Sequence, residues 1–391
     1  MPLADPSTGA PAPYAQLALQ LGVYLGHALH SSNSSENEEI PPADMSQFGF
    51  ASVAEVLDLC AAFMTNSFTL SSPSLAPVGV AISPPVALFN HSCWPNAVVV
   101  FPFGGYGSKA DGNCMDVVAL RDLVPGEQIV TAYIDISLPS QLRQTELQTR
   151  YFFKCDCDLC AKPSTDPREM VRPRESYDGL EDWVLSGMKL LKMEQQGTLV
   201  DFDQLLSKAS PMSVIGSLAY FYPPWAYPLF PLVRLVCTLL VTSLGAHPTD
   251  TDRLEDSIRC ALLVSECMGL PSIYPDNHPV RALARAELGK LLLLPPPPPP
   301  LLPVPQHSPN PSDAARSVLP KNLFDLAQTK IESIPRDPIH RLVLARTVLM
   351  DALRESRVGF GKPQGGLVGL EIAGLVEGVS REIEILKTQS G

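Results

Sequence analysis

The chain has 391 residues, of which 45% are hydrophobic and 18% are charged, a composition typical of globular proteins that excludes disorder of the whole chain. Its 29 basic and 41 acidic residues give a net charge of −12, which repels phosphate backbones, so we expect no direct binding of nucleic acid. This charge favours a basic partner, such as a lysine-rich protein tail.

The first 50 residues are predicted to hold a disordered segment and a helix. Residues 1–13 are rich in Pro, Ala, Ser and Gly, whereas residues 14–29 carry apolar side chains at helical spacing. A second helix is predicted over residues 52–65 with Ser52 as its N-cap. Its inward-facing residues are expected to be Val53, Val56, Leu57, Cys60 and Phe63.

Short extended segments follow this helix. They cover residues 67–70, 78–82, 97–101, 115–120 and 128–132, and Gly, Pro, Asp and Asn separate them. Residues 51–162 are therefore predicted to form a small β-rich domain.

A linker rich in proline and charge is predicted at residues 163–178, and residues 179–391 have the periodicity of helices. The predicted helices cover residues 180–194, 226–244, 252–268, 278–294, 313–334, 338–356 and 370–386. Their succession favours stacked helix pairs, although the tetratricopeptide (TPR) consensus is not legible. We therefore predict an all-α, TPR-like second domain, and an α+β chain as a whole.

A proline-rich insertion at residues 295–305 contains six consecutive prolines, which predict an extended polyproline II segment. Such a segment is either a surface insertion between helices or a site for a polyproline-binding partner with an aromatic-lined groove. The sequence leaves both interpretations open.

The most apolar segment, residues 229–244, is interrupted by Pro231 and Arg234 and is shorter than the roughly 20 residues of a membrane-spanning helix. We predict a core helix there and no membrane association. Cys237 in this segment, with Cys260 and Cys267 in a later one, is predicted to be a core residue.

Three thiols lie close together in the sequence, at Cys155, Cys157 and Cys160. Because the first residues lack the basic segment of a signal peptide, we expect the chain in the cytoplasm, the nucleus or both, where clustered cysteines hold metal more often than they form disulfides. Zinc prefers four tetrahedral ligands, so a fourth must come from elsewhere. The alternative is a chance cluster of reduced thiols.

Three segments together resemble a known family. They are Asn90-His91-Ser92-Cys93-Trp94-Pro95-Asn96, the segment from Gly126 to Tyr133, and the segment from Tyr151 to Cys160. Their order and spacing are similar to the C-terminal half of a SET domain with its post-SET cysteines, most closely in the SET and MYND family of protein lysine methyltransferases. The segment Asn66-Ser67-Phe68-Thr69 resembles an upstream motif of the family in the same register.

The resemblance implies a protein-lysine N-methyltransferase that uses S-adenosylmethionine to methylate a lysine of a histone or another protein. It assigns catalysis to Tyr133 and Tyr151 and a structural Zn²⁺ to Cys93, Cys155, Cys157 and Cys160. It implies that S-adenosylmethionine is bound by Asn66, Asn90, His91, Tyr133 and Phe153. Without the resemblance, we would interpret His91 as a turn residue whose imidazole has its hydrogen-bond partners, and Tyr133 as a core or rim residue of a strand.

The resemblance is close from residue 57 to residue 160 and looser at Asn277-His278-Pro279-Val280-Arg281, which is similar to the family's helical C-terminal domain. Residues 1–50 resemble neither the family's Gly-x-Gly strand nor its MYND zinc finger. A truncated sequence, a natural remnant that binds without catalysing and replacement by a partner chain all account for this. The alternative function is therefore a protein-interaction module that binds through its helical domain, with the SET remnant as a platform stiffened by zinc.

Overall fold

The computed structural model describes residues 12–30, 45–101, 115–163, 166, 168–169, 225–227, 229–245, 251–270, 273–295, 334–335, 337–361 and 364–390. Its chain divides into two compact units. The first unit takes the described residues of Met1–Leu70, Pro77–Phe89 and Gln148–Phe153. The second unit takes those of Ser71–Ala76, Asn90–Leu147 and Lys154–Gly391.

The first unit is built around two helices, α1 (Pro13–His30) and α2 (Val53–Asn66). Ser52 caps α2 as predicted, because its hydroxyl accepts a hydrogen bond from the N–H of Glu55 at 3.4 Å. The first unit also holds the short helices η1 (Met45–Phe48) and η2 (Val86–Leu88) and the paired strands β1 (Ser67–Ser71) and β2 (Pro77–Ile82).

A small core joins α1 and α2, where Tyr14 and Ala18 pack with Val56, Cys60 and Ala61. The expectation that Val53 and Phe63 face inward is wrong, since 66% of Val53 and 37% of Phe63 are exposed. Among the described helices α2 contacts mainly α1, so only one narrow stripe of its surface is covered.

The strands of the second unit form two pairs. β3 (Asn90–His91) runs parallel to β6 (Val130–Thr131), with Asn90 opposite Val130 and His91 opposite Thr131. β4 (Ala97–Val100) runs antiparallel to β5 (Asp116–Ala119), with Ala97 opposite Ala119. Each predicted extended segment thus contains a strand, but each described sheet has only two strands.

Two helices follow the strands, α3 (Ser140–Tyr151) and the single turn α4 (Asp158–Ala161). The sequence did not predict α3, because its residues are almost all polar and show no apolar period. Its buried side chains are Arg143 and Leu147.

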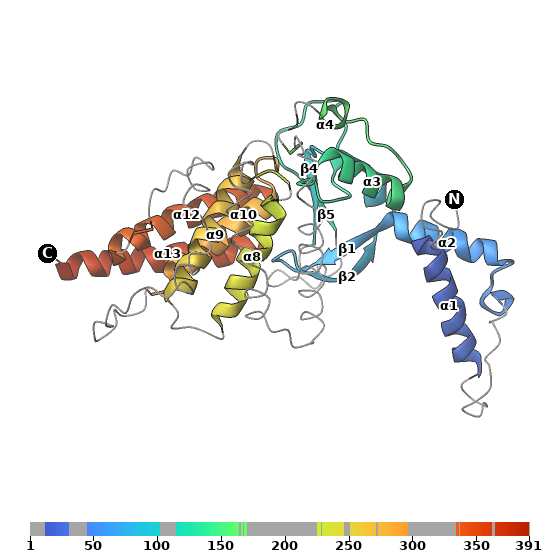
Figure 1. Cartoon of the computed structure of the whole chain (residues 1–391), viewed down its shortest axis with the longest axis horizontal. Coiled ribbons are helices and arrows are strands. Elements are labelled where there is room, and N and C mark those ends of the chain that lie inside the picture. The colour runs from blue at the N-terminus through green and yellow to red at the C-terminus, as the bar shows by residue number, and fades with distance from the viewer. Residues whose placement is uncertain are drawn as a thin grey trace, which may run out of the picture. The chain divides into compact units, whose positions relative to one another are not determined.

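Five helices complete the second unit: α8 (Leu229–Leu244), α9 (Thr251–Gly269), α10 (Pro279–Leu293), α12 (Pro338–Gly359) and α13 (Gly366–Ser390). Neighbours along this series pack on one another around an apolar core (Figure 1). All five lie where the sequence predicts helices, and Cys237, Cys260 and Cys267 are buried as expected. Among the described helices, none combines the length and the apolar character that crossing a bilayer requires.

Several predictions fall on other parts of the chain. The predicted helix at residues 180–194, most of the one at 313–334, most of the linker and residues 296–305 of the proline-rich insertion lie outside the described residues.

A hydrogen bond joins the strand region of the second unit to the loop before α10. The Asn277 side chain donates to the carbonyl of Leu120, at the end of β5, at 2.9 Å. Gly359, the last residue of α12, lies against the same loop, and a Cβ atom there would collide with the backbone oxygen of Asn277. Close packing at this point requires a glycine.

Candidate metal centre and active site

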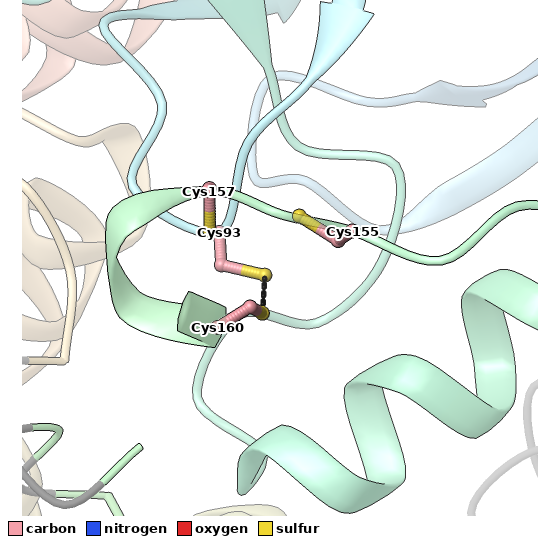
Figure 2. Close-up of side chains that lie close together, drawn as sticks. All are labelled: Cys93, Cys155, Cys157 and Cys160. Carbon is pink, nitrogen blue, oxygen red and sulfur yellow. Dashed lines mark hydrogen bonds between the residues drawn. The ribbon is translucent and has the colours of Figure 1, made fainter. Parts of the chain in front are cut away.

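Four cysteines from distant parts of the chain converge in the second unit (Figure 2). The sulfur atoms of Cys93, Cys155, Cys157 and Cys160 all lie within 4.8 Å of one another, and those of Cys93 and Cys160 are 3.5 Å apart. Tetrahedral zinc with bonds of about 2.3 Å separates its sulfur ligands by about 3.8 Å. The spacing of the four thiols therefore suits a zinc ion.

Local structure explains how the cysteines are presented. Cys93 lies in the loop between β3 and β4, and Cys157 caps α4. The Gln144 side chain on α3 holds the backbone of Cys155 on both sides: its amide donates to the Cys155 carbonyl at 2.7 Å, and its oxygen accepts from the Cys155 N–H at 3.0 Å. Sequence reasoning missed Gln144, since a glutamine on a polar helix carries no distinctive signal.

A buried arginine lies beside the sulfurs. Arg143 has no exposed surface, its guanidinium lies 4.0 Å from the Cys160 sulfur, and it pairs with Asp166 at 2.8 Å. Burial opposes its charge, but Cys93 and Asp166 outweigh this cost and raise the pKa of Arg143. Four thiolates on one zinc would carry an excess of two negative charges, and Arg143 would offset part of it. This residue was also missed by sequence reasoning.

The clustered thiols perturb one another. Hydrogen bonds from its neighbours, led by that of Cys155, lower the pKa of Cys157, whereas the same network raises the pKa of Cys93. A thiolate is the form of cysteine that binds metal.

His91 lies between the cysteines and the predicted catalytic tyrosine. Its Nδ1 atom accepts a hydrogen bond from the backbone N–H of Tyr133 at 3.0 Å, and its Nε2 atom lies 3.4 Å from the Cys93 sulfur. The rings of His91 and Tyr133 are 5.3 Å apart between centroids. Burial lowers the pKa of His91 to about 4, so its ring is neutral at physiological pH.

Asn96 fixes the turn that leads to Tyr133. Its amide group donates to Glu127 at 3.0 Å and to the carbonyl of Gln128 at 2.9 Å, and its oxygen accepts from the N–H of Val130 at 2.9 Å. Hydrogen bonds from Arg121 and Asn96 lower the pKa of Glu127 to about 2. Although Asn96 ends the first sequence motif, the sequence alone gave it no role.

The segment after Tyr133 runs into the helical core. Asp135 accepts a hydrogen bond from the Tyr274 hydroxyl at 3.2 Å and lies 3.7 Å from the Arg234 guanidinium. Ile136 is 2% exposed and belongs to the same apolar core as the helices. The tyrosine segment is therefore anchored at one end by the cysteine loop and at the other by the helices.

The predicted site residues divide between the two units. The second unit contains Asn90, His91, Tyr133 and the four cysteines, and of these the structure brings together His91, Tyr133 and the thiols. The first unit contains Asn66, Tyr151 and Phe153. Asn66 ends α2 and its side chain donates to the carbonyl of Ala62 at 2.8 Å, while Tyr151 ends α3. Their roles beside Tyr133 stay predictions.

Comparison with known proteins shows which proteins this chain resembles. Residues 24–134 match the family model of the SET domain. The N-lysine methyltransferase SMYD2 of Gallus gallus is 36% identical over 125 residues, which are 32% of this chain and 26% of that protein. The human SMYD2 is 36% identical over 118 residues, 30% of this chain and 25% of its own length.

A longer alignment extends into the helices. The histone-lysine N-methyltransferase SMYD3 of Mus musculus is 25% identical over 238 residues, 61% of this chain and 49% of that protein. These relatives confirm the resemblance to the SET and MYND family. The matched segment spans about a quarter of the chicken and human SMYD2 proteins and about half of SMYD3.

Proposed function

We propose that this chain is an S-adenosylmethionine-dependent protein-lysine N-methyltransferase that acts on a lysine of a histone or another protein. One observation carries the proposal: parallel pairing of β3 with β6 places the Asn90-His91 pair beside Tyr133, with His91 hydrogen-bonded to its backbone. The names of the SMYD2 and SMYD3 relatives support the same reaction.

The reaction needs a neutral lysine amine aligned with an activated methyl group. When bound, S-adenosylmethionine supplies that methyl group on a sulfonium. A bond from nitrogen to carbon forms, the bond from carbon to sulfur breaks, and the product ammonium loses a proton to solvent. The Tyr133 hydroxyl orients the amine, Tyr151 lines the lysine channel, and Phe153 packs on the adenine.

The polar residues of the site fit a polar methyl donor. Asn90 is exposed at the start of β3, so its amide is open to a solute that carries charged amino-acid groups. Asn66 and His91 complete the proposed binding set. The lysine-bearing substrate is proposed to be basic, in keeping with the net charge of −12.

Zinc is proposed at the four cysteines as a structural ion. Four protein sulfurs fill the coordination of zinc and leave no position for a reacting water. The ion would hold the Cys93 loop to the segment of Cys155, Cys157 and Cys160 without entering the chemistry.

Transfer of labelled methyl groups from S-adenosylmethionine to histones and to a cell lysate tests the function. We expect labelling that Tyr133→Phe lowers by about 100-fold, the range for losing the alignment of a reacting group. The matched control is Tyr24→Phe on α1, where the ring is 70% exposed, and it is expected to label like the natural chain. Equal labelling by Tyr133→Phe and the natural chain would remove the proposed role of Tyr133.

A second candidate is the interaction module that binds through its helices. The helices that would carry the binding pack on one another around an apolar core. Titration calorimetry with S-adenosylmethionine separates the two candidates. Heat of binding supports the enzyme, and its absence supports the module.

A further inference from the structure

We propose that the His91 side chain is a positioning residue that joins the cysteine centre to the backbone of Tyr133 through a fixed tautomer with its hydrogen on Nε2. This inference rests on the proposed zinc centre and deepens the proposed function. It gives the His91 ring a task separate from cofactor binding.

The first step is the bond to Tyr133. A backbone N–H is only a donor, so the Nδ1 atom that it meets at 3.0 Å must be an acceptor without a hydrogen. The distance lies within the ordinary range for such a bond. An imidazolium, which carries a hydrogen on both nitrogens, is incompatible with this contact.

The second step is the other nitrogen. A neutral imidazole with a bare Nδ1 carries its hydrogen on Nε2, and Nε2 lies 3.4 Å from the Cys93 sulfur. The Nε2–H group therefore donates to that sulfur.

The third step is mechanical. Cys93 is buried, and its sulfur is 3.5 Å from that of Cys160, so its position is set by the cysteine cluster. His91 transmits this position to the backbone of Tyr133 through one rigid ring. A group that contacts a metal ligand in this way typically changes metal affinity by 10–100-fold when it is replaced.

Nuclear magnetic resonance of the whole chain with isotope-labelled histidine tests the tautomer directly. The His91 signal is the one that disappears in a His91→Gln variant. We expect nitrogen shifts that put the hydrogen on Nε2, and, after loading with a spin-active cadmium isotope, scalar coupling between this hydrogen and the metal. A hydrogen on Nδ1, or an imidazolium at neutral pH, would overturn the proposal.

Two variants separate the two bonds of the ring. In His91→Gln the side-chain amide is long enough to donate to the Cys93 sulfur, whereas in His91→Asn it is only long enough to meet the Tyr133 N–H. We expect His91→Asn to lower zinc affinity by about 10-fold or more and His91→Gln to stay near the natural chain. Equal zinc affinities of the two variants would refute the bond to sulfur.

Neither readout depends on methyl transfer, so the two proposals fail separately. If the chain shows the expected tautomer and metal coupling but no methyl transfer, only the proposed methyltransferase function is contradicted. An active chain with its hydrogen on Nδ1 contradicts only the role of the ring.

Discussion

Replacement of Asn96 with alanine tests the turn that carries Tyr133. The Asn96 side chain is 5% exposed and bonds the carbonyl of Gln128 and the N–H of Val130 at 2.9 Å each. Each such bond contributes about 1 kcal/mol net, so the variant is expected to lose about 2 kcal/mol at this turn. The third bond of Asn96 is to the carboxylate of Glu127, whose side chain is 22% exposed.

Hydrogen exchange at the backbone N–H of Ser92 measures the effect. This group donates to the carbonyl of Thr131 at 3.0 Å and so reports the opening of β3 from β6 without touching Asn96. A loss of about 2 kcal/mol predicts exchange that is about 30-fold faster. The matched control is Asn90→Ala, whose side chain is exposed, and it should change exchange by about twofold or less. If Asn96→Ala exchanges no faster than this control, the reasoning is refuted.

Three further predictions follow from burial and packing. Metal analysis of the purified chain should find one zinc ion, which the Cys157→Ser variant should lose. The control variant Cys60→Ala, in the core of α1 and α2, should retain the ion. Equal metal content in the two variants would contradict the cysteine centre. Burial lowers the pKa of His278 to about 4 from 6.5, so its contribution to stability is full above pH 6.5 and is lost as the pH falls toward 4. The His278→Asn variant keeps a helix-capping side chain but cannot titrate. In denaturant unfolding, its free energy of unfolding should therefore fall less between pH 6.5 and pH 5 than that of the natural chain. Equal falls in the two proteins would contradict a contribution from His278. Thermal unfolding should show that Gly359→Ala destabilises the chain through backbone collision, whereas Gly378→Ala in α13, where the space is open, stabilises it by about 0.5–1 kcal/mol; the same sign for both would contradict the packing.

Local patterns predicted most of the helices. α2 was predicted through the Ser52 cap and α10 through an apolar period that follows a proline. α3 escaped because a helix that buries an arginine has no apolar stripe to read. The prediction that Val53 faces inward was wrong for a related reason. The sequence shows which side chains are apolar but not how many neighbours cover them.

The candidate site was readable only where its parts are neighbours in sequence. Cys155, Cys157 and Cys160 show a metal pattern by themselves, but Cys93 lies 67 positions before Cys160, and only the family resemblance linked it to them. Arg143 has no such motif, because its importance comes from burial beside sulfur. Polar side chains of this kind acquire a role only when folding brings distant segments together.

The anchoring of Ile136 in the helical core has a practical consequence for recombinant work. A fragment that stops after the post-SET cysteines would strip the cover from this side chain and leave Asp135 without Tyr274. Such a fragment is expected to be poorly soluble and prone to self-association. A recombinant fragment should therefore keep the strands and the helices of the second unit together.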